Sequence, residues 1–270
     1  MNITYCCFEV SSQCNMGCEF CFSDWRKAKV QVSTLKAKHI IGVLKQNGLK
    51  AINLTGGECL LRDDIVELCG YAKHLGLIVI ISTNGIELKN KMEILDYIDA
   101  INLPLDSHDS VTHNIMRPCI CENHHALILD LIDYIRFQKP NIKIKVNTLV
   151  SAFNKDEIVK IGELLNGKVF RWKLGKFLSI GYGEKYKEKF DISKADFENL
   201  VSKVSQKYPD SGFFDEDFEE EYIFIDNQGQ INQVTASGSV KHGEIDNLSS
   251  LPEINSKEIY FNKIYNKKGA

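Results

Sequence analysis

Three closely spaced cysteines near the amino terminus constrain this chain more than any other feature. Cys14, Cys18 and Cys21 follow an apolar run in Cys-x3-Cys-x2-Cys spacing. Three thiolates on one short loop can hold an iron–sulfur cluster, because the short gaps close the site at little loss of loop entropy. A cubane [4Fe–4S] cluster held by three cysteines keeps one iron without a protein ligand, which a small molecule can chelate. The spacing therefore predicts one such cluster.

Two other interpretations of these cysteines are a structural zinc site and plain buried thiols. Zinc usually takes a fourth Cys or His, commonly from a second Cys-x2-Cys pair, and no such pair follows. The nine cysteines all lie at or before Cys121. An odd number in this arrangement suits a reducing cytosol and a metal cluster better than a disulfide framework. We therefore expect a cytoplasmic protein.

Size and charge narrow the possible partners. With 270 residues and 44% hydrophobic content, the chain can bury one large core. A net charge of −3 gives no electrostatic reason to expect a nucleic acid polymer or a membrane surface. No apolar run approaches the ~18 residues of a membrane span, and the first residues do not form a signal peptide. We expect neither nucleic acid nor membrane as a partner.

Hydrophobic periodicity alternates between strand and helix along the first 207 residues. Strand-like runs cover residues 3–10, 51–54, 77–81, 100–105, 142–150 and 168–174. Helical patterns cover residues 33–46, 63–75, 92–97, 124–138, 155–165 and 193–207. Repeated β–α units with short joins predict an α/β fold with parallel strands and right-handed crossovers.

The last part of the chain has a different pattern. Residues 213–221 are acidic and aromatic, and we expect the acidic run 215–221 to be a solvated segment. Residues 222–226 and 230–234 flank Asn-Gln-Gly and predict a hairpin. We expect residues 1–210 to form the main domain and residues 211–270 a carboxyl-terminal extension packed on it.

Charge on two predicted strands indicates the kind of substrate. Polar and apolar residues alternate in 143–147 and 171–174, so the polar ones share one face of each strand. If the apolar residues pack under helices, the side chains that point into the barrel are those of Lys145, Asn147, Arg171 and Lys173. Buried cations need a partner, and no comparable acidic set faces them. A polyanionic substrate such as a triphosphate fits. The alternatives are strand ends that emerge into solvent and a reversed assignment of the faces.

The cysteine motif, with Phe20 before its third cysteine, resembles the radical S-adenosylmethionine (SAM) superfamily. Thr55-Gly56-Gly57-Glu58 looks like the family's Gly-Gly-Glu segment, which holds the amino group of SAM. Ser82-Thr83-Asn84-Gly85 lies where the family contacts the SAM ribose. The resemblance implies a partial (β/α)6 TIM-like barrel with its site at the carboxyl ends of the strands. It also implies one [4Fe–4S] cluster, SAM, and an electron donor such as flavodoxin or ferredoxin.

The SAM-binding residues that this resemblance implies extend beyond the two quoted segments. They are Phe20, Thr55, Gly56, Gly57, Glu58, Ser82, Asn84, Asp106 and Arg117. Many relatives carry cysteines for auxiliary clusters after the hairpin, whereas none occurs here beyond Cys121. One cluster is therefore expected.

Within the superfamily, residues 3–250 look most like viperin and its prokaryotic relatives. The resembling segments are Cys18-Glu-Phe-Cys21-Phe22, Lys145-Val146-Asn147 with Phe153-Asn154, and Arg171-Trp172-Lys173. Viperins use a 5′-deoxyadenosyl radical to take the 4′-hydrogen of a nucleoside triphosphate. Loss of water gives a 3′-deoxy-3′,4′-didehydro nucleotide that serves antiviral defence. By resemblance, Arg117, Lys145, Arg171 and Lys173 grip phosphates, and Asn147 helps place the nucleotide.

The sequence departs from viperins at a few positions. Ala51 stands where animal viperins have lysine, and Cys7 and Cys59 replace an asparagine and a proline. Rival functions are a single-cluster radical SAM enzyme acting on a peptide or another metabolite, and a non-catalytic iron–sulfur or zinc protein. Hydrogen abstraction needs no general acid or base, so none is expected.

Further cysteines and histidines are assigned structural places. Cys59 is expected to be a small buried thiol, with hydrogen-atom donation as its alternative. We expect Cys119 and Cys121 in a loop or the core, and the pair His124-His125 at the surface.

Overall fold

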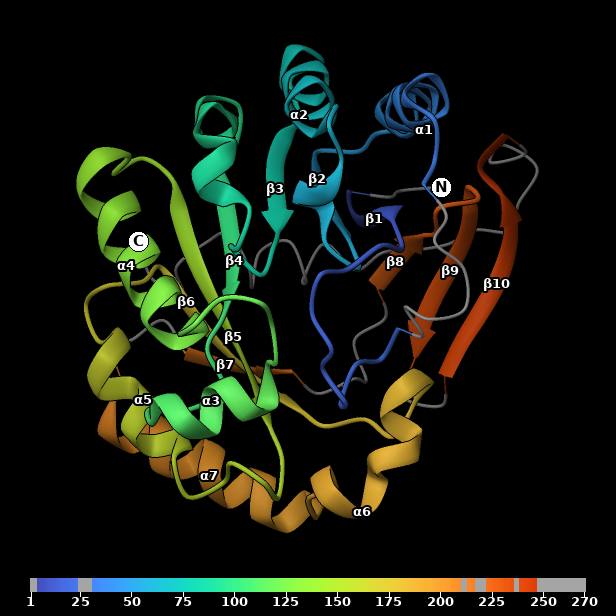
Figure 1. Cartoon of the computed structure of the whole chain (residues 1–270). Helices are drawn as coiled ribbons and strands as arrows, with labels where there is room; N and C mark the ends of the chain where they lie inside the picture. Colours follow the sequence, from blue (N-terminus) through green and yellow to red (C-terminus); the bar gives the residue numbers. More distant parts are fainter. Residues whose placement is uncertain (1–3, 24–30, 210–212, 217–221, 236–237, 247–270) are drawn as a thin grey trace.

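The protein is built on one ten-stranded sheet. The computed structural model describes residues 4–23, 31–209, 213–216, 222–235 and 238–246. The strand order is β10-β9-β8-β1-β2-β3-β4-β5-β6-β7. The sheet curves into an arc with helices along its outer side and does not close, as Figure 1 shows. The fold is a partial α/β barrel, as predicted.

Seven strands are parallel neighbours in sequence order. They are β1 (Tyr5–Ser11), β2 (Ala51–Gly56), β3 (Ile78–Ser82), β4 (Ala100–Pro104), β5 (Lys143–Val150), β6 (Arg171–Lys176) and β7 (Phe213–Glu216). The α-helices are α1 (Thr34–Gln46), α2 (Ile65–His74), α3 (Ser110–Met116), α4 (His124–Gln138), α5 (Ile158–Leu165), α6 (Lys187–Phe190) and α7 (Lys194–Lys207). Short 3₁₀-helices complete the elements, at η1 (Cys59–Leu61), η2 (Leu88–Asn90), η3 (Met92–Asp96) and η4 (Gly181–Tyr186).

Polar side chains fix where the longer helices begin. The hydroxyl of Ser33 accepts a hydrogen bond from the Lys36 amide at the start of α1, and Ser193 does the same at α7. Asn123 accepts from the Ala126 amide at the start of α4. Such caps satisfy backbone donors that have no partner in the first helical turn. The predicted starts of these helices are confirmed.

Several elements differ from the predictions: α6, the 3₁₀-helices η1, η2 and η4, and a strand at Gly238–Glu244 were not expected. Residues 92–97 were expected to be a helix and contain the short 3₁₀-helix η3. Helix α3 was not expected, because its seven residues are too few for a clear periodicity. Part of the predicted solvated acidic run belongs to β7, whose backbone pairs with β6; residues 217–221 lie outside the described residues. Strand pairing decides this segment more than its charge does.

The two faces of the sheet carry different side chains. Ile144 and Val146 of β5 and Trp172 of β6 belong to the main core under the helices. The opposite, inner face has its own small apolar cluster at the amino ends of the strands, made of Tyr5, Ala51, Ile80 and Ala100. Successive strand residues alternate between faces. Lys145, Asn147, Arg171 and Lys173 therefore lie on the inner face, and the reversed assignment is wrong.

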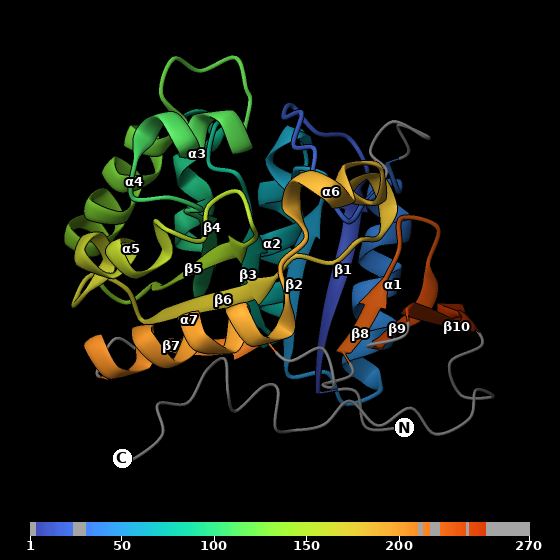
Figure 2. The ribbon, with the colours of Figure 1, turned by 90° about the horizontal axis from the view of Figure 1, so that it is seen from below.

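The predicted hairpin extends the sheet beyond β1. Strand β8 (Tyr222–Ile225) pairs parallel with β1, and β9 (Gln230–Thr235) pairs antiparallel with β8. Strand β10 (Gly238–Glu244) follows at the edge, at the opposite end of the sheet from β7 (Figure 2). Ile223 and Ile231 are buried in the main core. Among the described residues, no helix has the length and apolar character needed to cross a bilayer.

Candidate active site

The cysteine loop follows β1 at the carboxyl end of the barrel. Cys18 is buried, and Cys14 and Cys21 are half-buried. Burial raises the pKa of Cys14 to about 11 and that of Cys18 to about 12. The charge of Cys21 raises both further. The three thiols therefore lie close enough to influence one another's ionisation.

The donor set fits an iron–sulfur cubane. In the part of the chain that the structure describes, no three His, Cys, Asp or Glu side chains converge as ligands of a single metal ion. A cubane distributes its thiolates over separate irons, so its ligands stand farther apart than those of one ion. Nearby, Asn15 Nδ2 is buried and has no hydrogen-bond partner among the described residues. A donor thus remains for a group bound beside the cysteines.

Neighbouring backbone holds the cysteine loop in place. The Gly17 amide donates to the Pro118 carbonyl at 3.0 Å, and Met16 forms an isolated β-bridge with Cys119. On the other side, the Gly183 amide of η4 donates to the Cys21 carbonyl at 2.9 Å. These contacts come from segments remote in sequence. The loop is therefore shaped by the barrel around it.

The glycine pair at the end of β2 lies directly against this loop. The Gly57 amide donates to the Ser11 carbonyl at 2.9 Å, and the Glu58 amide donates to the Gln13 carbonyl at 2.7 Å. A Cβ on Gly56 would lie 2.0 Å from the Ser11 oxygen, and one on Gly57 would lie 2.3 Å from the Gln13 oxygen. Gly56 also has a φ of 152°, which other residues rarely adopt. Backbone contact with the cysteine loop therefore requires both glycines.

The Glu58 carboxylate joins the ends of β2 and β3. Its Oε1 accepts from the Leu60 amide at 2.9 Å and from the Thr83 hydroxyl at 2.7 Å, and its Oε2 accepts from the Asn84 amide at 2.6 Å. Burial raises the pKa of Glu58, whereas these donors lower it. Asn84 Nδ2 in turn donates to Asn15 Oδ1 at 2.8 Å. The segments predicted to bind SAM are thus linked to each other and to the cysteine loop.

Asp106 and Arg117 form a buried pair beyond β4. Asp106 Oδ2 accepts from Arg117 Nε at 2.5 Å, and Asp106 Oδ1 accepts from the Leu149 amide at 2.8 Å. The Arg117 guanidinium lies 5.1 Å from the Phe20 ring centre. Burial lowers the pKa of Arg117, but the charges of Asp106 and Cys18 raise it, and the pKa lies above its ordinary value. These contacts place Arg117 beside the cysteine loop and the predicted SAM site.

The other predicted substrate residues line the inner face of β5 and β6. Lys145 pairs in register with Arg171, and Asn147 with Lys173. Lys145 is 7% exposed and Arg171 is 8% exposed. Asn147 Oδ1 is buried and accepts no hydrogen bond from the described residues. This set is a basic wall with one acceptor left for a bound group.

Cys7 of β1 faces this basic wall. Burial raises the pKa of Cys7, hydrogen bonds from Tyr5 and Asn53 lower it, and the charges of Lys145 and Lys173 lower it further. Asn53 donates to the Cys7 sulfur at 3.5 Å and accepts from the Ser82 hydroxyl at 3.0 Å. Ser82 is therefore part of an inner-face network. Thr55, the remaining residue of the predicted set, pairs in register with Glu9 of β1.

Several buried residues around the site have no clear signal in the sequence. His124 and His125 were expected at the surface, but both are buried, because His124 contacts a buried His113 on α3. Arg62 is also fully buried and binds the backbone at both stems of the cysteine loop. From the sequence, a lone arginine or histidine in a polar segment is predicted to be exposed to solvent. Only the tertiary contacts show that it is buried.

The remaining cysteines have structural places. Cys59 is buried, and its thiol donates to the Ser82 carbonyl at 3.4 Å, in keeping with a packed thiol. Cys119 and Cys121 form a disulfide, where an ordinary loop or core pair was expected. The two cysteines are two residues apart in sequence, and Cys119 also forms the β-bridge with Met16.

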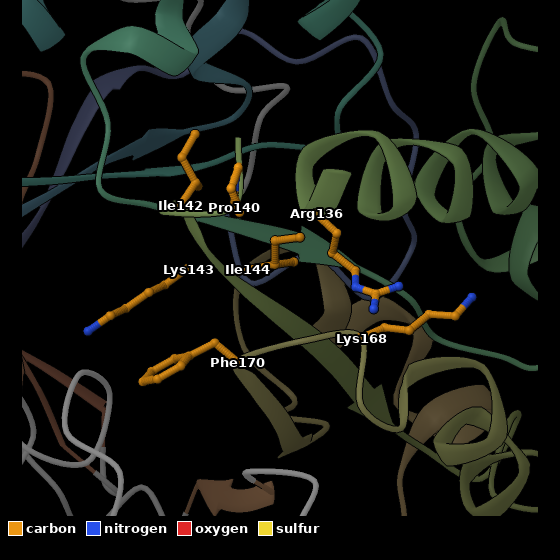
Figure 3. A pocket seen from close by; sticks show the side chains of 7 residues that line it. All are labelled: Arg136, Pro140, Ile142, Lys143, Ile144, Lys168 and Phe170. Carbon is orange, nitrogen blue, oxygen red and sulfur yellow. The ribbon is translucent and has the colours of Figure 1, made fainter. Parts of the chain in front are cut away.

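A separate cavity lies at the other end of the barrel. It has a volume of about 260 Å³ and is lined by Arg136, Lys143, Lys168 and Phe170, among others (Figure 3). Lys143 begins β5, so the cavity lies at the amino ends of the strands. In α/β barrels this end serves stability, whereas chemistry occurs at the carboxyl ends. The cavity is therefore not part of the candidate site.

Known proteins are similar to this chain over most of its length. Residues 8–165 match the family model described as the Radical SAM superfamily. A protein from Selenomonas ruminantium named S-adenosylmethionine-dependent nucleotide dehydratase is 30% identical over 235 residues, covering 82% of this chain and 83% of that protein. A protein of the same name from Flammeovirga pacifica is 26% identical over 239 residues, covering 83% and 80%.

A solved structure has the same fold. The crystal structure of Streptococcus suis SuiB bound to S-adenosylmethionine matches with a TM-score of 0.74 and 18% identity. The match covers 98% of this chain and 68% of the SuiB chain. At this identity the likeness shows the fold alone.

Proposed function

The chain belongs to the radical SAM superfamily and is an enzyme of this type, and on this premise we propose that its substrate is a nucleoside triphosphate. The product we propose is the 3′-deoxy-3′,4′-didehydro nucleotide, which is the substrate less one water. Its formation removes the 4′-hydrogen atom and the 3′-hydroxyl, which leaves as water, and takes up one electron from the reductant and one proton from solvent. Relatives named nucleotide dehydratases match over most of the chain. This similarity supports the choice of substrate class.

The observation that carries the proposal is the buried basic wall on β5 and β6. Lys145, Arg171 and Lys173 share the inner face with Asn147. Buried cations favour an anionic ligand, and planar guanidinium groups suit phosphate oxygens. The free acceptor Asn147 Oδ1 suits a hydroxyl or amino group of the nucleotide. We propose that these four residues bind the triphosphate and orient its sugar.

The remaining site residues hold the cofactors. We propose that Cys14, Cys18 and Cys21 bind one [4Fe–4S] cluster. When bound, the cluster and SAM supply a carbon-centred radical that can take a hydrogen atom. The backbone carbonyls around Gly57 and Asn84 would hold SAM, with Arg117 beside it. The protein's own contribution is orientation and exclusion of water, which brings the sugar 4′-carbon into reach.

The deciding experiment is anaerobic turnover of the reconstituted enzyme with SAM and dithionite. CTP, UTP, GTP and ATP are supplied separately, and mass spectrometry follows 5′-deoxyadenosine and any nucleotide lighter by one water. We expect one nucleotide to give the dehydrated product. If 5′-deoxyadenosine forms at the same low rate with every nucleotide and none is altered, the proposal fails. Peptides and other metabolites then become the substrates to test.

A matched pair of variants tests the basic wall. Removing one charge-assisted hydrogen bond costs about 1.5–3 kcal/mol, so Lys145→Ala should lower kcat/KM about 10- to 150-fold. Lys143→Ala is the control, because Lys143 is the first residue of β5, two residues before Lys145 on the same face, and lines the separate cavity at the amino ends of the strands. It should leave kcat/KM within about twofold. Equal losses in both variants would contradict the proposed phosphate site.

We further propose a physiological setting for this reaction. A nucleotide without a 3′-hydroxyl stops polymerase extension, which fits a role in antiviral defence. Phage plaque counts on cells that carry the parent gene or Cys18→Ala test this role, and equal counts contradict it. A flavodoxin or ferredoxin that replaces dithionite in turnover would identify the electron donor.

A further inference from the structure

Two buried histidines connect the segments that follow β3 and β4. His113 lies on α3 and His124 is the first residue of α4, and their exposures are 0% and 1%. His113 Nε2 lies 2.8 Å from His124 Nδ1. The Asp106 amide donates to His113 Nδ1 at 3.1 Å. At the other end, His124 Nε2 lies 2.8 Å from the Asn84 carbonyl oxygen.

The two backbone groups, the Asp106 amide and the Asn84 carbonyl, determine which ring nitrogen of each histidine carries the proton. A backbone N–H can only donate, so His113 Nδ1 carries a lone pair and the proton sits on Nε2. This proton is donated to His124 Nδ1, and the His124 proton therefore sits on Nε2. A carbonyl can only accept, so His124 Nε2–H donates to Asn84. For two neutral rings, a single tautomer of each satisfies all three hydrogen bonds.

The surroundings keep both rings neutral. Burial lowers the pKa of His113 to about 2, and the charges of Arg117, His124 and His125 lower it further. Burial also lowers the pKa of His124 to about 4, although the Asn84 carbonyl and Asp106 oppose this. Arg117 and Asp106 are thus the charged groups that face the pair. The chain of hydrogen bonds keeps its direction throughout the neutral pH range.

Asp106 and Asn84, the residues at the two ends of this series of hydrogen bonds, both belong to the predicted SAM site. Asp106 forms the ion pair with Arg117, and the Asn84 amide binds Glu58. In the described residues, β3 and β4 pair only up to Ser82 and Asn102. The segments beyond these residues are joined instead through the two helices that carry the histidines. The two histidines thus link the segment after β3 to the segment after β4, and both segments belong to the predicted SAM site.

We propose that His113 and His124 are positioning residues that fix the Asn84 segment relative to the Asp106–Arg117 pair and thereby set the affinity for SAM. The inference rests on the proposed SAM site and is independent of the nucleotide substrate. The two imidazoles hold the Asp106 amide and the Asn84 carbonyl at a fixed separation through directed hydrogen bonds. A side chain of similar size without both ring nitrogens would fill the same space and leave the two segments unlinked.

SAM affinity of the reconstituted enzyme is the first test, measured by equilibrium dialysis without nucleotide. His124→Phe keeps a ring and removes both hydrogen bonds, and we expect the Kd for SAM to rise at least about tenfold. His124→Gln keeps a donor near the Nε2 position and should recover most of this loss. His124→Asn ends near the Nδ1 position, too short to reach Asn84, and should not recover it.

The control is His125→Phe. His125 is buried beside His113, at 5.5 Å between ring centres, but lies outside the chain of hydrogen bonds. This variant should bind SAM within about twofold of the parent. A folded His124→Phe enzyme with unchanged SAM affinity would overturn the proposal. So would an equal loss in His125→Phe, since general packing would then explain both.

A second test needs no variant that could unfold. Nitrogen-15 NMR of the full chain labelled at histidine reports which ring nitrogen carries each proton. We expect His113 and His124 both to be protonated at Nε2, with no titration between pH 6 and 8. A proton on Nδ1 of either ring, or titration within this range, would overturn the directed chain. Failure of every nucleotide in turnover would leave both tests unaffected.

Discussion

We expect the stability of the cysteine loop to depend on a single buried side chain, that of Arg62. Its Nη1 donates to the carbonyls of Val10 at 2.7 Å and Val32 at 2.6 Å. Val10 lies at the end of β1 before the loop, and Val32 lies just before α1 after it. Nε and Nη2 bind the two oxygens of Asp64 at 2.8 Å and 2.6 Å. One guanidinium therefore clamps both stems of the loop.

Arg62→Met removes this clamp while keeping a side chain of similar length. Breaking a buried ion pair from one side costs about 3–5 kcal/mol, because the other charge stays buried. Asp64 keeps one donor, the Thr34 hydroxyl at 2.5 Å, and its side chain is 16% exposed, which favours the lower end. The two abandoned carbonyls add about 1 kcal/mol each. We expect the free energy of unfolding of the iron-free protein to fall by about 5 kcal/mol.

Urea unfolding followed by circular dichroism measures this loss, and thermal unfolding should shift by about 10 °C. Iron bound after reconstitution should fall as well, since both stems are loosened. The control Arg136→Met removes a half-exposed arginine 3.5 Å from Asp133 and should change stability by less than about 0.5 kcal/mol. A loss below about 1 kcal/mol in Arg62→Met would refute the clamp.

Three further predictions concern the same end of the barrel. Gly57→Ala places a Cβ 2.3 Å from the Gln13 carbonyl, so we expect lower iron retention after gel filtration, and retention equal to the parent would contradict this. Burial near Asp226 raises the pKa of Glu9 to about 7, so the folded state binds this proton more tightly and loses stability as pH rises from about 4.5 to about 7. In urea unfolding, Glu9→Gln should match the parent near pH 4 and be more stable at pH 8, by up to about 3 kcal/mol. Because burial raises the pKa values of Cys14 and Cys18, iron loading against a chelator should increase between pH 7 and 9, and loading independent of pH would contradict proton release on binding.

The inner face of the barrel was predictable because it depends on local alternation. Lys145 and Asn147 flank an apolar Val146, and this pattern alone sets their common face. The Gly56-Gly57 pair was recognisable as a motif, but its physical reason, contact with the carbonyls of Ser11 and Gln13, appears only in the structure.

The buried hydrogen-bond donors could not be predicted in the same way. Arg62 lies 52 residues from Val10, and His124 lies 40 residues from Asn84. Neither pairing leaves a periodic or compositional signal, because Arg62 directly follows a three-residue 3₁₀-helix and His124 is the first residue of α4. Burial of such groups depends on how the β–α units close around the site, and the tertiary fold decides it.

The pairing of β8 with β1 has a consequence for solubility. With β8 present, β1 is hydrogen-bonded along both edges over Cys6–Phe8, and the backbone there is shielded. Without the hairpin, a mainly apolar strand would expose a row of unpaired amides and carbonyls. Such an edge can recruit the same strand of another copy. The carboxyl-terminal hairpin thus protects the strand that leads into the cysteine loop from intermolecular aggregation.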